Sequence, residues 1–234
     1  IGFGIYSILD LYPDNQGHNR TVLFVQTSGN RGYYIIDDEI YSPNNRQSDL
    51  YYYGFGNRTI SGSSVEWQVD DKVVNYSVLY PKVQIEPIQG KVYRDDTINF
   101  TTNGVKITPT TTGDVRIISL LSISYHNESR IQVLPLQPSD FTSQIQGNAI
   151  GWVINGSDFF IIPQSGSDVP ILRGTRQKIP QMVSTFEIQG ITTECHRLFF
   201  QKDGSSVSEI YCHGVSLHYG DKSFTYQAEK KLIP

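Results

Sequence analysis

Adjacent carboxylates are the residues that most directly suggest catalysis. Three such pairs occur, Asp37-Asp38, Asp70-Asp71 and Asp95-Asp96, and a glycosidase needs two carboxyl groups that flank one bond. Neighbouring residues on a strand point to opposite faces, so no adjacent pair supplies that arrangement. We expect these pairs in turns, where Asp hydrogen-bonds to its own backbone. A dyad built from distant carboxylates is the alternative. Because no nucleophile elbow, phosphate-binding loop or zinc-protease motif occurs, the sequence predicts a protein that is not an enzyme.

The two cysteines, Cys195 and Cys212, flank a predicted two-residue turn at Asp203-Gly204. Such a turn makes them a directly opposed pair with Cα atoms about 4.5 Å apart, which a disulfide can bridge. Two buried thiols that are merely neighbours are one alternative. Zinc is another because histidines lie nearby, but His196 and His213 would point away from the sulfurs and C-x-x-C spacing is absent. We predict the disulfide.

A tyrosine-rich segment, Asp49–Gly56, is the candidate ligand-binding site. Three consecutive tyrosines, Tyr51, Tyr52 and Tyr53, cannot all face one core if the segment is a strand, so at least one ring should be exposed. Exposed tyrosine offers a large contact area at low entropic cost, together with a hydroxyl, which suits recognition of protein or glycan. We therefore expect these residues and Phe55 to bind a ligand. The alternative is a strand buried on both faces.

Glycosylation sequons indicate the compartment. Six Asn-x-Ser/Thr acceptors occur, more than the composition gives by chance: Asn19, Asn57, Asn75, Asn99, Asn127 and Asn155. Glycans at such sites would be hydrophilic shields on a secreted or surface protein. The alternative is the plain abundance of Asn, Ser and Thr in exposed β proteins. The sequence therefore predicts an extracellular, surface-exposed location.

The elements that must position these residues are strands. The chain has 234 residues with 15 Tyr and 11 Phe but a single Met, and 20 Gly and 11 Pro interrupt it every few residues. This composition favours strand over helix. Short β-branched or aromatic runs separated by turn residues predict an all-β, antiparallel barrel or sandwich built from hairpins. Ser139–Gly147 allows a short helical turn. We expect one domain over residues 1–234, with Leu134–Asp140 as the most plausible internal boundary.

Two further hairpins are predicted from Asn-Gly pairs, because both residues tolerate the positive φ of a type I′ turn. They are Asn103-Gly104 and Asn155-Gly156. The first turn would place Phe100 opposite Ile107, and the second would place Trp152 opposite Phe159.

Charge and hydropathy exclude several partners. The net charge of −4 argues against nucleic acid, which requires a basic surface. No run of 18 apolar residues occurs, so no membrane insertion is expected. The segment Asp10–Gly17 is rich in oxygen ligands but lacks calcium-loop spacing, so a plain turn is favoured and no cofactor is expected. Since the chain opens on Ile1, we expect a processed product or an excised domain.

Both ends of the chain carry residues in an order typical of one known family. They are Ser7-Ile8, Asp10, Pro13, Gly17, Arg20, Leu23 and Val25 near the start, and Val215, Leu217, Gln227-Ala228 and Ile233-Pro234 near the end. In these segments the chain resembles the capsid spike domain of astroviruses. The resemblance implies a β-barrel-like, non-enzymatic, dimeric unit that binds a host receptor from the virion surface. It also implies assembly in the cytosol, where sequons stay empty and cysteines stay reduced.

The segments around the two cysteines, Thr193-Glu194-Cys195 and Ile210-Tyr211-Cys212, carry a second resemblance. They resemble the closing hairpin of paramyxovirus attachment glycoproteins. It would account for the sequons and a disulfide, although two cysteines are far too few for that propeller.

We therefore expect an attachment domain that binds a host receptor, either protein or glycan, as a homo-oligomer with a dimer favoured. A structural β subunit of an extracellular filament or layer is the alternative, with Ile1–Leu11 as the strand offered to a neighbour. A secreted carbohydrate-active protein is the third interpretation.

Overall fold

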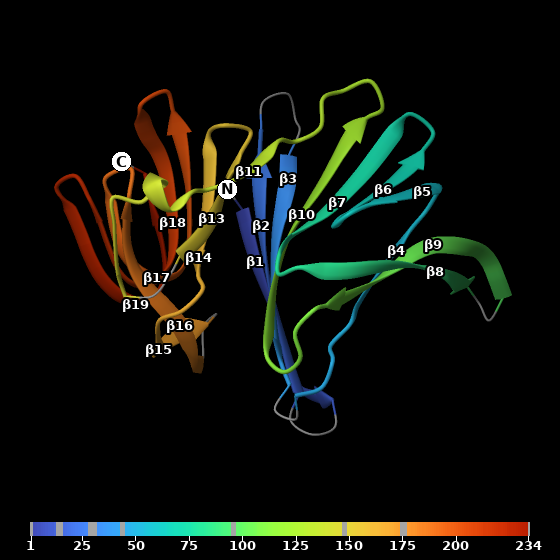
Figure 1. Ribbon diagram of the computed structural model, residues 1–234, viewed down its shortest axis with the longest axis horizontal. Helices are drawn as coiled ribbons and strands as arrows, with labels where there is room; N and C mark the ends of the chain where they lie inside the picture. The colour runs from blue at the N-terminus through green and yellow to red at the C-terminus, as the bar shows by residue number, and fades with distance from the viewer. Residues whose placement is uncertain are drawn as a thin grey trace. The chain divides into compact units, whose positions relative to one another are not determined.

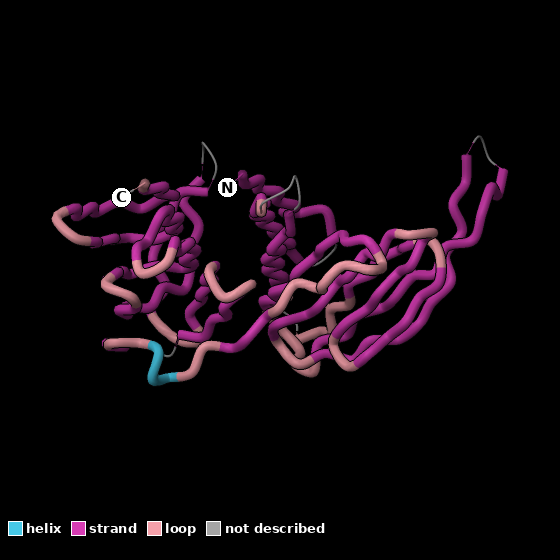
Figure 2. Tube along the Cα trace, turned by 90° about the horizontal axis from the view of Figure 1, so that it is seen from above, coloured by secondary structure: helices cyan, strands magenta, loops and turns pink. Residues whose placement is uncertain are grey.

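The protein is built almost wholly of antiparallel strands. The computed structural model describes residues 2–12, 16–27, 32–42, 45–94, 97–146, 149–173 and 177–233. Strands make up most of the described residues, and within these ranges the helical structure is one 3-10 turn, Pro138–Asp140, drawn in cyan in Figure 2. The predicted all-β class is confirmed. No helix in these ranges is long and apolar enough to cross a membrane.

The chain divides into two compact units, Ile1–Arg130 and Ile131–Pro234. The division falls just before Leu134–Asp140, the stretch that the sequence marks as the most plausible boundary. That residues 1–234 form a single domain stays a prediction.

The first unit contains a seven-stranded antiparallel sheet, ordered β1-β2-β3-β10-β7-β6-β5. Its strands are β1 (Gly2–Tyr12), β2 (Gln16–Gln26), β3 (Gly32–Tyr41), β10 (Val115–Tyr125), β7 (Lys72–Tyr80), β6 (Ser64–Val69) and β5 (Asn57–Ser61). Apolar and polar residues alternate along β6 and β7, so that Val65, Trp67, Tyr76 and Val78 face one side and are buried there.

A three-stranded sheet, β4-β9-β8, covers that side. Its strands are β4 (Leu50–Gly54), β9 (Thr97–Pro109) and β8 (Val83–Arg94), and they run across the strands of the larger sheet (Figure 1). Leu50, Val105 and Ile107 from the small sheet share one core with Trp67 and Tyr76 from the large one. The first unit is therefore a two-layer sandwich whose small sheet has an outer face turned away from this core.

The second unit holds a nine-stranded sheet with the path β11-β13-β14-β17-β16-β12; β15 also pairs with β16, and β18 pairs with β17 and β19. Its strands are β11 (Val133–Pro135), β12 (Ser143–Gln146), β13 (Ala149–Ile154), β14 (Asp158–Pro163), β15 (Ser167–Arg173), β16 (Gln177–Ile188), β17 (Ile191–Asp203), β18 (Ser206–Tyr219) and β19 (Lys222–Leu232). Its core includes Phe186, Leu198, Phe200 and Ile210.

The predicted hairpin at Asn103-Gly104 is wrong. Both residues lie inside β9, which pairs with β4 on one side and β8 on the other. Neither adopts positive φ. Phe100 is opposite Val92, and Ile107 is opposite Ile85 and Leu50. The glycine at this position serves close side-chain packing, described below, and not a turn.

The hairpin at Asn155-Gly156 is confirmed, but its register differs by one residue. Asn155 and Gly156 have φ of 50° and 75°, and the loop also includes Ser157, because Ile154 pairs with Asp158. Trp152 is therefore opposite Phe160, and not opposite Phe159 as predicted.

The hairpin at Asp203-Gly204 is also confirmed, and again its register is wrong. Asp203 pairs with Ser206, so the turn is Gly204-Ser205, and irregularities along β17 and β18 shift the pairing further. Cys212 is opposite Leu198 and Cys195 is opposite Gly214. The cysteines are not a cross-strand pair, and both are buried thiols. The predicted disulfide is therefore corrected to the alternative of two buried thiols.

Candidate functional site

The tyrosine segment forms β4, and its side chains alternate as a strand requires. Leu50 and Tyr52 face the core, whereas Tyr51 and Tyr53 lie on the outer face of the small sheet. Tyr51 is 53% exposed, Tyr53 57% and Phe55, just past the strand end, 50%. The expectation that at least one ring faces solvent is confirmed, and ligand binding by these residues stays a prediction.

The Tyr53 ring packs over two glycines. A Cβ at Gly90 would lie 2.5 Å from Cε1 of Tyr53, and a Cβ at Gly104 would lie 2.7 Å from its Cδ1. The ring therefore occupies the space that side chains on β8 and β9 would fill. Packing over both strands restricts the ring while leaving more than half of the residue exposed, so it is a rigid aromatic surface.

Several polar side chains surround Asp49 on the same outer face. Asp49 accepts a hydrogen bond from Thr108 Oγ1 at 2.7 Å and pairs with Lys106 Nζ at 3.2 Å. This contact and the charge of Asp49 raise the pKa of Lys106. Lys106 is the cross-strand neighbour of both Tyr51 and Glu86. Charged groups of both signs therefore border the tyrosines.

A cavity of about 490 Å³ opens beside Tyr51. The residues that line it are His18, Arg20, Ile40, Gln47, Ser48, Asp49, Leu50 and Tyr51. Its volume lies within the range of about 300–1,000 Å³ typical of small-molecule sites. Tyr51 lines the cavity and belongs to β4, the strand that bears the exposed tyrosines, and Asp49 lines the cavity directly before that strand, so the two features are contiguous.

A buried carboxylate, Asp38, contacts two of the residues that line this cavity. It contacts His18 Nε2 at 2.6 Å and accepts hydrogen bonds from Arg20 Nε at 2.7 Å and Nη2 at 3.1 Å. Arg20 Nη2 also donates to Tyr52 Oη at 2.9 Å, and the Tyr52 and Tyr76 ring centroids are 4.4 Å apart. This network unites residues from β2, β3, β4 and β7.

The expectation that Asp37-Asp38 lies in a turn is wrong. Both residues are fully buried in β3 and point to opposite faces, so Asp37 pairs instead with Arg116 at 2.7 Å. Asp70-Asp71 does lie in a turn, where Asp70 has a φ of 54°. Asp95-Asp96 lies outside the described residues.

The network holds its phenols neutral. Burial, with the neighbouring Tyr76 and Asp38, raises the pKa of Tyr52 far above its ordinary value. Burial likewise raises the pKa of Tyr76 to about 12. Burial alone would lower the pKa of Arg20, but the hydrogen bond and charge of Asp38 outweigh it and raise that pKa. Near neutral pH neither tyrosine supplies a phenolate that could act as a base.

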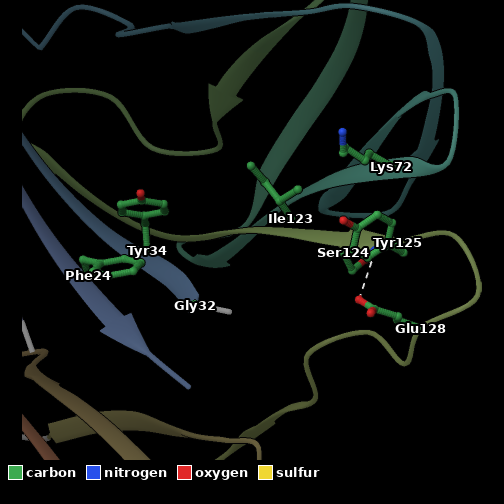
Figure 3. Close-up of a pocket in the computed structure, with 8 residues that line it drawn as sticks. All are labelled: Phe24, Gly32, Tyr34, Lys72, Ile123, Ser124, Tyr125 and Glu128. Carbon is green, nitrogen blue, oxygen red and sulfur yellow. Dashed lines mark hydrogen bonds between the residues drawn. The ribbon is translucent and has the colours of Figure 1, made fainter. Parts of the chain in front are cut away.

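A second aromatic surface lies on the large sheet (Figure 3). Its pocket is lined by Phe24, Gly32, Tyr34, Lys72, Ile123, Ser124, Tyr125 and Glu128. The Phe24 and Tyr34 ring centroids are 5.0 Å apart. Glu128 accepts a hydrogen bond from the Tyr125 backbone at 3.0 Å, the dashed line in Figure 3. No local sequence pattern marks this pocket, because its residues come from four separate segments.

The sequon asparagines differ in exposure. Asn57, Asn127 and Asn155 are exposed, whereas Asn75 is half-buried and donates to Glu66 at 3.3 Å. Asn19 is fully buried in β2, which contradicts its role as a glycan acceptor in the folded chain. The side chain of Asn99 lies outside the described residues. In the part of the chain that the structure describes, no group of three or more His, Cys, Asp or Glu is arranged to hold a metal ion.

Comparison with known proteins identifies a fold and no family. No family model and no curated protein matches the chain. A solved heparinase III is 17% identical over 66% of this chain and 24% of its own, with a TM-score of 0.49. The heparan sulfate lyase HepC from Pedobacter heparinus is 13% identical over 75% of this chain and 27% of its own, with a TM-score of 0.50.

The chain thus spans about a quarter of the length of each of these two proteins. At these identities the likeness to HepC shows an all-β fold of related architecture. Neither structure is a capsid spike, and the astrovirus resemblance stays a prediction.

Proposed function

We propose that this chain is a non-enzymatic recognition domain, which attaches to a receptor through the outer face of the β4-β9-β8 sheet. The observation that carries the proposal is the exposure of Tyr51 and Tyr53 side by side on that face, with the Tyr53 ring seated on glycines. Rigid, exposed aromatic rings are typical of recognition surfaces, because they bury a large area while few rotamers are lost.

Binding fits the neighbouring cavity better than catalysis does. The Asp38 carboxylate is engaged by His18 and Arg20, and the raised pKa values of Tyr52 and Tyr76 keep both phenols protonated. A general base works best when its pKa lies near the operating pH. These tyrosines therefore suit a scaffold that holds the cavity open.

The proposed setting is an exposed one, outside a cell or on a virion, with a host receptor as partner and a dimer as the favoured assembly. Three sequon asparagines are accessible, and accessible sequons are compatible with passage through a secretory pathway.

The test is attachment of the fluorescently labelled 234-residue chain to a panel of eukaryotic cells, measured by flow cytometry. We expect saturable binding that falls at least tenfold in the Tyr51→Ala/Tyr53→Ala variant. The matched control, Tyr34→Ala/Tyr125→Ala, also removes two exposed tyrosines and should bind as the unaltered chain does. Absence of saturable binding, or equal loss in both variants, would refute the proposal.

A carbohydrate-active enzyme is the second candidate, favoured by the cavity that His18 and Arg20 line. HepC is described as a heparan sulfate lyase, so heparan sulfate is the first substrate to try. Shortening of the polymer by the unaltered chain, abolished in His18→Ala, would support this candidate. A constant chain length on size-exclusion chromatography is the result that our proposal predicts.

A further inference from the structure

The outer tyrosines and the adjoining cavity form one continuous surface with two distinct chemistries. Tyr53 and Tyr51 are two residues apart on one strand and on the same face, hence about 7 Å apart. Tyr51 also lines the cavity, where Asp49, Gln47 and His18 present polar atoms. An aromatic strip therefore leads directly into a cavity rich in hydrogen-bonding groups.

Resting on the function proposed above, we propose that this surface binds an uncharged saccharide. A pyranose ring has an apolar face of C–H groups and an edge of hydroxyls. The apolar face can pack on the flat rings of Tyr53 and Tyr51, whose own character is amphipathic. The hydroxyls can both donate and accept, which matches a cavity that offers carboxylate, amide, imidazole and guanidinium groups together.

The polar groups of the cavity are held in fixed positions. Asp49 is fixed by Thr108 and Lys106, and the Gln47 amide donates to the Pro109 carbonyl at 2.9 Å. Arg20 is fixed by Asp38 and Tyr52. Groups whose rotamers are already fixed lose little entropy when a ligand binds, and this favours recognition of a small, hydroxyl-rich molecule.

The balance of charge favours an uncharged saccharide over an acidic one. Arg20 is paired with Asp38 and Lys106 with Asp49, at 2.7 and 3.2 Å. Glu86, next to Lys106 across the strands, adds an exposed negative charge. Among these described groups no positive charge is left in excess to attract a sulfate or uronate, and Glu86 would repel such a group.

The size of the surface favours a saccharide over a protein. A stable protein interface buries about 800 Å² on each partner, whereas two rings and a cavity of about 490 Å³ match a short oligosaccharide. A protein receptor that occupies the same face is the competing outcome in the experiment below.

The experiment is a binding screen of the 234-residue chain against immobilised uncharged oligosaccharides of glucose, galactose, mannose and N-acetylglucosamine. A second set of immobilised probes consists of sulfated and uronate-containing oligosaccharides. We expect binding to at least one uncharged probe and at least tenfold weaker binding to acidic probes. Titration calorimetry on the bound probe should show a loss of tenfold or more in Tyr51→Ala, and less than threefold in Tyr51→Phe, because stacking needs the ring and not the hydroxyl.

Two controls separate binding from folding. Tyr34→Ala removes an exposed tyrosine from the other pocket and should leave the affinity unchanged. Gly90→Ala places a methyl group where the Tyr53 ring lies and should weaken binding while both tyrosines are retained. Thermal unfolding followed by circular dichroism must show that each variant is folded.

The outcomes separate this inference from the proposed function. Binding only to acidic probes, binding that survives in Tyr51→Ala, or cell attachment that persists after enzymatic removal of glycans would overturn the saccharide assignment. In the last case, tyrosine-dependent attachment would still support the recognition domain. If the chain attaches to no cell and to no probe, both proposals fail.

Discussion

At the residue scale, the function of β4 depends on the period of two in a strand. The sequence predicts that three consecutive tyrosines divide between two faces, and the structure places Tyr52 inside and Tyr51 and Tyr53 outside. The partner of Tyr52 could not be predicted. Arg20 lies 32 positions earlier in the chain, and their contact arises only when the small sheet covers the large one. Local patterns carry no signal for such contacts.

The buried phenol of Tyr76 gives a prediction about alkaline pH. Its pKa in the folded chain is about 12, against 10.0 for an ordinary tyrosine. The folded state therefore favours the protonated phenol. The contribution of this phenol to the free energy of unfolding is complete below pH 10 and is lost as the pH rises through 12. The loss approaches about 1.4 kcal/mol per pH unit in that window. We expect the free energy of unfolding of the Tyr76→Phe variant to fall less between pH 10 and 12 than that of the unaltered chain.

Urea unfolding followed by Trp67 fluorescence, in a Trp152→Phe background, restricts this measurement to the first unit. Equal pH dependence with Tyr and with Phe at position 76 would show that the phenol does not titrate as described.

At the element scale, strand existence was predictable and register was not. Asn155-Gly156 and the region of Asp203-Gly204 do form hairpins, but the pairing at each is displaced, because one extra loop residue or one strand irregularity shifts every pair beyond it. Asn103-Gly104 shows a different limit. Gly104 lies in β9, where the Tyr53 ring occupies the position that a side chain would take. In a sequence, a glycine that accommodates a neighbouring side chain cannot be told from a glycine that forms a turn.

Close packing at another glycine gives a prediction for how β4 is anchored. A Cβ at Gly54 would lie 2.5 Å from the Trp67 ring, which is buried and donates its indole N–H to the Asn103 carbonyl. Gly54→Ala should therefore destabilise the first unit by about 1–3 kcal/mol through overpacking. Gly62 has no atom near its Cβ position and a φ of 57°, which Asn tolerates.

Gly62→Asn is thus the matched control and should change stability by less than about 1 kcal/mol. The measurement is the urea concentration at the unfolding midpoint of each variant, and we expect a lower value for Gly54→Ala than for Gly62→Asn. Similar midpoints would mean that the Trp67 contact does not hold β4 in place.

At the scale of the whole molecule, exposure decides which sequons can be used. Asn57, Asn127 and Asn155 are exposed and Asn19 is fully buried. A sequence motif marks all of them alike, because it reports residue type and not burial.

We expect glycans at Asn57, Asn127 and Asn155, and none at Asn19, when the chain is expressed through a eukaryotic secretory pathway. Glycopeptide mass spectrometry before and after glycosidase treatment gives the occupancy of each site. A glycan at Asn19 would contradict the burial of β2, and empty exposed sites would favour the cytosolic assembly that the astrovirus resemblance implies.

The central claim is that the molecule attaches to its receptor through the outer face of the β4-β9-β8 sheet. Hydroxyl-radical footprinting of the cell-bound chain against the unbound chain locates that face directly, since both aromatic surfaces contain half-exposed tyrosines. We predict that oxidation of Tyr51 and Tyr53 falls at least threefold on binding, while that of Tyr34 and Tyr125 stays the same. Protection of Tyr34 and Tyr125 with Tyr51 and Tyr53 still oxidised would contradict the claim and assign recognition to the pocket on the large sheet.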